Sequence, residues 1–63
     1  MEKENALLIE VRAKIGTTVH TVWGPSTVHE VIQDKDGTWV VHLLEFGEEP
    51  YSINLSDWNA SMA

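Results

Sequence analysis

The chain has 63 residues, ten of them acidic and four basic, with a formal net charge of −6 and no cysteine. A chain this short forms one small domain that buries only about 60% of the surface of its unfolded form, so its stability margin is narrow. The lack of cysteine excludes disulfides and thiolate metal sites. Its apolar runs, Leu7-Leu8-Ile9 and Trp39-Val40-Val41, are far too short to cross a membrane. We therefore expect a soluble, cytoplasmic protein.

The first residues and the charge distribution add two expectations. The acidic opening Met1-Glu2-Lys3-Glu4 disfavours a secretory signal. From Ile15 onward, Lys35 is the only Lys or Arg. Binding to a phosphate backbone needs several cations on one face, so the sequence argues against binding to nucleic acid. Acidic excess keeps a small protein soluble, but it also allows an inhibitor that imitates nucleic acid.

Residues 1–15 fit two structures. A helix would place Leu7, Leu8, Val11 and Ile15 on one stripe and would end at Gly16. A strand would alternate apolar and polar residues over the same stretch. The Glu, Lys, Ala and Leu content favours the helix, and an extra strand is the alternative.

Residues 16–58 predict a meander of short strands. Residues 17–23 are β-branched and aromatic, and Gly24-Pro25 interrupts them. Residues 26–33 and 38–46 form the next two strands around Asp36-Gly37, which predicts a type I′ hairpin turn. A loop at 47–50, a strand at 51–55 and one helical turn at 56–58 complete the meander. Residues 59–63 read as a frayed tail.

Symmetric turns would fix the sheet register. His20 would then face His29, and His42 would face Val31. The three histidines would share a face with five apolar residues, Val22, Val31, Val40, Leu44 and Phe46. The opposite, more apolar face would form the interior, with Val19, Trp23, Val28, Ile32, Trp39, Val41 and Leu43. The histidine face is too apolar to stay exposed, so the N-terminal segment or a partner should cover it.

This order of elements resembles an SH3-like barrel, which implies a mainly β fold of about five short strands with an N-terminal helix or extra strand. The stretch from Gly16 to Gly24, with Val28, Val31, residues 39–43 and Phe46, is similar to the Tudor- and KOW-like barrels of bacteria. These include the polymerase-interacting domains of transcription-coupling factors and of repair helicases. The resemblance covers residues 16–58 and implies a protein-docking module. The chain departs from the family at Ser26-Thr27, where Gly is usual, and in lacking basic residues.

Two groups of side chains are candidate sites. His20, His29 and His42 would offer zinc three imidazoles if they converged, although ordinary strand positions are the favoured interpretation, and no cofactor is expected. Tyr51 and Trp58 lie where SH3-like barrels often form ligand grooves, so the resemblance makes them candidate partner contacts. Trp58 should then be partly exposed, and its alternative role is to cap the barrel end.

No catalytic motif is present: the adjacent carboxylates Glu48 and Glu49 have no base or nucleophile beside them. We therefore expect a small non-catalytic protein-interaction module that docks on a larger enzyme such as a polymerase. Its surplus apolar surface predicts a homo-oligomer. The alternatives are an acidic inhibitor that imitates nucleic acid, from a mobile element, and a small oligomeric enzyme with a site between subunits.

Overall fold

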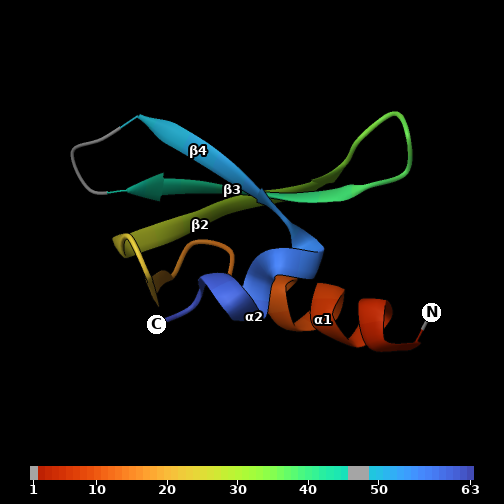
Figure 1. Cartoon of the computed structure of the whole chain (residues 1–63), viewed down its shortest axis with the longest axis horizontal. Coiled ribbons are helices and arrows are strands. Elements are labelled where there is room, and N and C mark those ends of the chain that lie inside the picture. Colours follow the sequence, from red (N-terminus) through yellow and green to blue (C-terminus); the bar gives the residue numbers. More distant parts are fainter. Residues whose placement is uncertain (1, 46–48) are drawn as a thin grey trace.

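A computed structural model of the chain describes residues 2–45 and 49–63. Helix α1 (Glu2–Arg12) is followed by the strands β1 (Thr18–Thr21), β2 (Gly24–Gln33), β3 (Trp39–Glu45) and β4 (Pro50–Asn54), the 3-10 turn η1 (Leu55–Asp57) and the short helix α2 (Trp58–Ser61) (Figure 1). The strands form one open antiparallel sheet in the order β1-β2-β3-β4. The mainly β class and the N-terminal helix are confirmed. No helix in the described ranges is long and apolar enough to cross a membrane.

Backbone hydrogen bonds connect the segment after helix α1 to strand β2. Gly16 has a φ of 87°, a backbone conformation that glycine adopts without steric cost. Its N–H donates to the Val28 carbonyl at 2.7 Å, and the Val28 N–H donates to the Thr17 carbonyl at 3.0 Å. These bonds hold the helix against the sheet, with Leu8 and Val11 buried.

The first hairpin turn lies two residues earlier than the sequence predicts. Thr21 pairs with Gly24, so the turn consists of Val22 and Trp23, and Gly24-Pro25 belongs to β2. The Thr21 hydroxyl closes this turn, donating to the Gly24 carbonyl at 2.8 Å and accepting from the Trp23 N–H at 3.1 Å. As a result, His20 faces Pro25 rather than His29.

The second hairpin also departs from the predicted register. Gln33 pairs with Trp39 across a five-residue loop in which Gly37, not Asp36, has a positive φ of 91°, so the turn is not type I′. The pairing also shifts between Val28 and Glu30. Such a β-bulge leaves one residue, here His29, without an opposite partner.

The bulge reverses the orientation of the residues beyond it. Between the bulge and the hairpin loop, His42 faces Glu30, and Val31 faces Val41 on the core side of the sheet. The predicted pairing of His42 with Val31 is wrong because the loop between Gln33 and Trp39 has five residues instead of the two or four assumed for a symmetric turn. Val31 packs against the core instead of sharing the histidine face.

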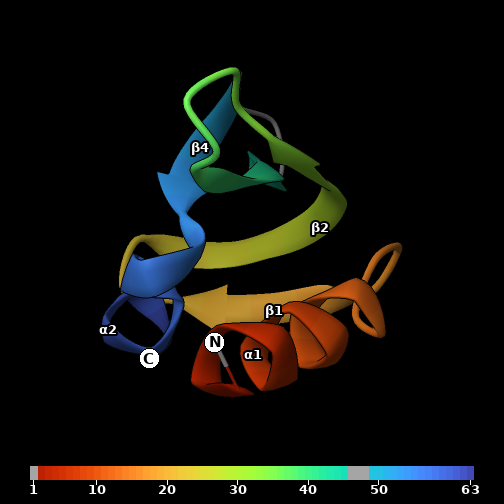
Figure 2. The same ribbon diagram turned by 90° about the vertical axis from the view of Figure 1, so that its right-hand side faces the viewer.

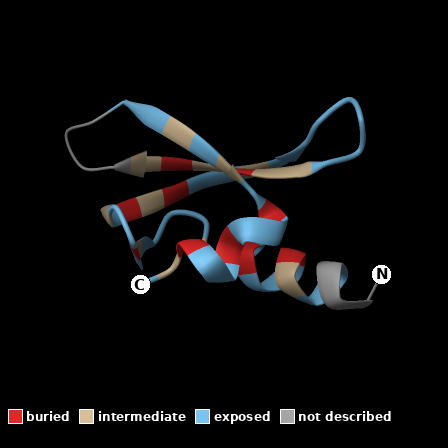
Figure 3. Ribbon diagram, in the orientation of Figure 1, coloured by how far each residue is buried: buried red, intermediate tan, exposed pale blue. Residues whose placement is uncertain are grey.

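The core lies between the lower part of the sheet and the three helical elements, where buried positions gather (Figure 3). Among the described residues, seven apolar side chains form this core: Leu8, Val11, Val28, Val41, Leu43, Leu55 and Trp58. The predicted interior is confirmed for Val28, Val41 and Leu43, and Val19 and Trp39 pack against it. It is wrong for Trp23 and Ile32, which are 55% and 40% exposed.

The C-terminal residues return to the first strand. Met62 forms an antiparallel bridge with Thr21. The Val22 N–H donates to the Ser61 carbonyl and the Ala63 N–H donates to the His20 carbonyl, both at 2.8 Å. Figure 2 shows α1 and α2 next to β1, at one end of the bent sheet. The predicted frayed tail at 59–63 is wrong, because α2 and this bridge order the segment.

Candidate binding surfaces

The three histidines lie at separate places. His20 is opposite Pro25, His29 is at the bulge, and His42 is opposite Glu30. Within residues 2–45 and 49–63, there is no group of at least three His, Cys, Asp or Glu side chains that could hold a metal ion. Val40 and Leu44 do alternate with the core residues of β3 and so share the outer face with His42. Phe46, predicted on the same face, lies outside the described residues, as does Glu48.

Trp58 does not belong to an exposed groove. Its side chain is 2% exposed and packs in the core with Leu55, so its predicted partial exposure is wrong. Trp58 is the first residue of α2, and its side chain lies between the helical elements and the sheet. This position favours the alternative role predicted for Trp58, which is to close the end of the core.

Tyr51 is half-buried and anchored by a hydrogen bond. It lies opposite Leu43 on strand β4, and its hydroxyl is 2.7 Å from the hydroxyl of Ser26. Ser26 is itself buried. The phenol ring is therefore fixed at the rim of the core.

Trp23 is the exposed aromatic residue that sequence reasoning assigned to the core. It lies in the β1–β2 turn, and its ring meets the Tyr51 ring edge-on, with 5.9 Å between centroids and 75° between planes. Val22 beside it is 58% exposed. Val22, Trp23 and Tyr51 together make an aromatic edge. The sequence signal for this placement is the glycine at position 24. Gly24 directly follows the two-residue turn and has a φ of 126°, a conformation that glycine adopts readily.

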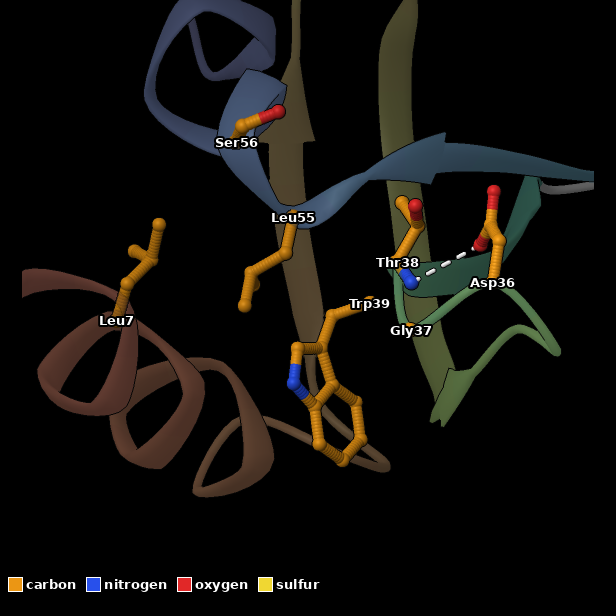
Figure 4. A pocket seen from close by; sticks show the side chains of 7 residues that line it. All are labelled: Leu7, Asp36, Gly37, Thr38, Trp39, Leu55 and Ser56. Carbon is orange, nitrogen blue, oxygen red and sulfur yellow. Dashed lines mark hydrogen bonds between the residues drawn. The ribbon is translucent and has the colours of Figure 1, made fainter. Parts of the chain in front are cut away.

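A pocket of about 480 Å³ forms a second surface (Figure 4). Leu7 from α1, Trp39 from β3 and Leu55 from η1 provide its apolar wall. The β2–β3 loop adds Asp36, Gly37 and Thr38, and η1 adds Ser56. The pocket therefore lies where three elements that are distant in sequence meet.

Two interactions hold the pocket walls in place. The Arg12 guanidinium carbon lies 5.2 Å from the centre of the Trp39 ring, a cation–π contact between α1 and the sheet. The Asp36 Oδ1 accepts a hydrogen bond from the Thr38 N–H at 3.0 Å. This backbone hydrogen bond lowers the pKa of Asp36 below its ordinary value, and a hydrogen bond from the Thr38 side chain adds to the effect. The Asp36 carboxylate is therefore ionised at neutral pH.

Comparisons of the chain with protein-family models, with curated proteins and with solved structures found no match. The aromatic edge and the pocket are accordingly the features on which a function can be based.

Proposed function

We propose that this protein is a small, non-catalytic protein-interaction module of the cytoplasm, with Trp23 as its main contact residue. The 55% exposure of Trp23 carries this proposal. Exposed Trp and Tyr side chains that reach into a partner are the residues that dominate binding energy at interfaces. Tyr51, predicted as a contact residue, supports the Trp23 ring through their edge-on contact, and Trp58 takes no direct part.

The aromatic edge is held rigid before any partner binds. The Thr21 hydroxyl makes two hydrogen bonds within the turn that carries Trp23, and the contact between the Ser26 and Tyr51 hydroxyls anchors the second ring. A side chain already held in its bound conformation loses less entropy on association. This rigidity favours recognition of another folded protein.

The nature of the partner follows from charge and from the family resemblance. A net charge of −6 favours a partner with a basic surface, because complementary charge speeds association. We propose a larger enzyme such as a polymerase, as the resemblance to bacterial Tudor- and KOW-like barrels implies. The bridge between Thr21 and Met62 supports an SH3-like barrel in which the C-terminal residues act as a short fifth strand beside β1.

The test is a comparison of two variants in partner capture. Trp23→Ala removes the proposed contact, and Ile32→Ala removes an exposed apolar side chain elsewhere on the sheet as the matched control. The tagged proteins are crosslinked in cells of the native host, and the captured proteins are quantified by mass spectrometry. We expect the same partner with wild type and Ile32→Ala, and at least a tenfold loss with Trp23→Ala, in line with hot-spot truncations of about 2 kcal/mol.

Retention of the partner by Trp23→Ala would refute the aromatic edge as the contact. If that binding also weakened steeply with salt, the acidic inhibitor that imitates nucleic acid would be the better explanation.

A further inference from the structure

We propose that the pocket between α1, the β2–β3 loop and η1 binds a primary ammonium group carried on an alkyl chain. This site is separate from the aromatic edge, since none of Val22, Trp23 and Tyr51 lines it. The proposal rests on the pairing of an apolar wall with a single carboxylate at the rim.

The apolar wall suits an alkyl chain. Leu7, Trp39 and Leu55 come from three different elements and face one space, with Leu55 directed toward the Trp39 ring and Leu7 across from it (Figure 4). The volume of about 480 Å³ is within the range of roughly 300–1,000 Å³ that is typical of small-molecule sites. Each methylene group of the ligand that leaves water for this wall adds to the affinity.

The polar rim selects a cation over an anion. Asp36 is the only charged side chain among the residues described as lining the pocket. One of its oxygens is occupied by the Thr38 N–H, and Figure 4 shows the other turned away from Thr38. The hydroxyls of Thr38 and Ser56 add further acceptors. An ammonium group has three N–H donors and no acceptor, so it matches this set, whereas a carboxylate or phosphate would be repelled.

Arg12 determines where the ligand cation would lie. Its guanidinium already covers the Trp39 ring, and Arg12 does not line the pocket. The ring is therefore held in position by a charge of the protein itself. The ligand ammonium would accordingly bind at Asp36, with its alkyl chain along Leu7 and Leu55.

The test uses the whole ¹⁵N-labelled chain and three probes of equal length: hexylammonium, 1-hexanol and hexanoate, at neutral pH and constant ionic strength. Two-dimensional amide spectra report binding at Gly37 and Thr38 and at the Trp39 indole N–H. We expect hexylammonium to shift these signals with a Kd about fivefold lower than that of 1-hexanol, the upper end of the effect of an exposed ion pair, and hexanoate to bind weakest. Equal affinity for hexylammonium and 1-hexanol, or no shift at these signals, would overturn the proposal.

Asp36→Asn and Asp34→Asn form a matched pair of variants. Asn at 36 keeps an oxygen that can accept from the Thr38 N–H but removes the charge, and Asp34 is in the same loop outside the pocket. We expect Asp36→Asn to abolish the fivefold preference for the ammonium and Asp34→Asn to preserve it. An Asp36→Asn protein that retains the preference would contradict the proposed role of the carboxylate.

A fourth probe distinguishes the two sources of such a group. Nα-acetyl-lysine-N-methylamide presents a lysine side chain without a free α-amine. Binding equal to that of hexylammonium identifies a lysine of a protein partner as the natural ligand, and much weaker binding identifies a free alkylamine. Both outcomes support the ammonium site, and neither depends on Trp23.

Discussion

Trp58 and Trp23 are the same residue type in opposite environments, 2% and 55% exposed. Trp58 is buried in the core, and Trp23 lies in a surface turn. Replacing each by alanine therefore separates a packing role from a binding role.

We expect Trp58→Ala to unfold the protein. Truncation of a buried Trp destabilises by about 3–5 kcal/mol, and a chain of 63 residues has a total stability of only about 3–9 kcal/mol. Far-ultraviolet circular dichroism and urea titration measure the effect, with Trp23→Ala expected to stay folded. A folded Trp58→Ala protein that has lost its partner would instead restore Trp58 as a contact residue.

Asp36 should make stability depend on pH at acidic values. Its pKa is lowered in the folded state by the Thr38 N–H, so its stabilising effect is complete above its unfolded pKa of about 3.9. The effect disappears as the pH falls through the lower, folded pKa. We expect the urea midpoint of wild type to fall more between about pH 7 and about pH 2.5 than that of Asp36→Asn. Equal decreases in the two proteins would contradict this role.

The junction between α1 and the sheet depends on the backbone conformation of Gly16. A methyl group at this position would have no atom within 4 Å, so Gly16→Ala meets no steric clash and only the φ of 87° opposes it. We expect a destabilisation of about 1 kcal/mol, measured by urea unfolding. Gly16→Asn should recover part of this loss, since Asn tolerates positive φ. An unchanged midpoint for Gly16→Ala would show that α1 is not held through this turn.

At the scale of the elements, strand positions follow from the sequence more closely than strand pairing does. Alternation and β-branched residues predict strands near their observed ranges, because these patterns reflect the two faces of each strand. The register depends on single residues: the Thr21 hydroxyl that closes a turn and the bulge at His29. The early first turn places His20 opposite Pro25 instead of His29, and the five-residue loop places His42 opposite Glu30, so the predicted histidine cluster does not form.

For the molecule as a whole, apolar surface remains exposed on the N-terminal segment. Ile9 of α1 is 68% exposed and Ile15, just after this helix, is 44% exposed, while Leu8 and Val11 of α1 are buried in the core. We propose that this surface joins two copies of the chain, in keeping with the homo-oligomer expected from the sequence.

Sedimentation equilibrium at micromolar concentration tests this association. We expect a mass above the 7.1 kDa of one chain for wild type and for Ile32→Glu, and the mass of one chain for Ile9→Glu. Ile9→Glu places a charge in the proposed contact, where desolvation is unfavourable, and Ile32→Glu places the same charge on the sheet. A wild-type protein with the mass of one chain would refute the association.

Composition and local pattern alone predict a small, acidic, mainly β domain and favour a helix over a strand at the N-terminus, because helix propensity and alternation are properties of neighbouring residues. The pocket and the aromatic edge depend on contacts between distant segments. Leu7, Asp36 and Leu55 meet only when α1, a hairpin loop and η1 pack together, and Trp23 meets Tyr51 only through the register of the sheet. No local pattern encodes those distances, so three-dimensional packing placed Trp58 inside and Trp23 outside.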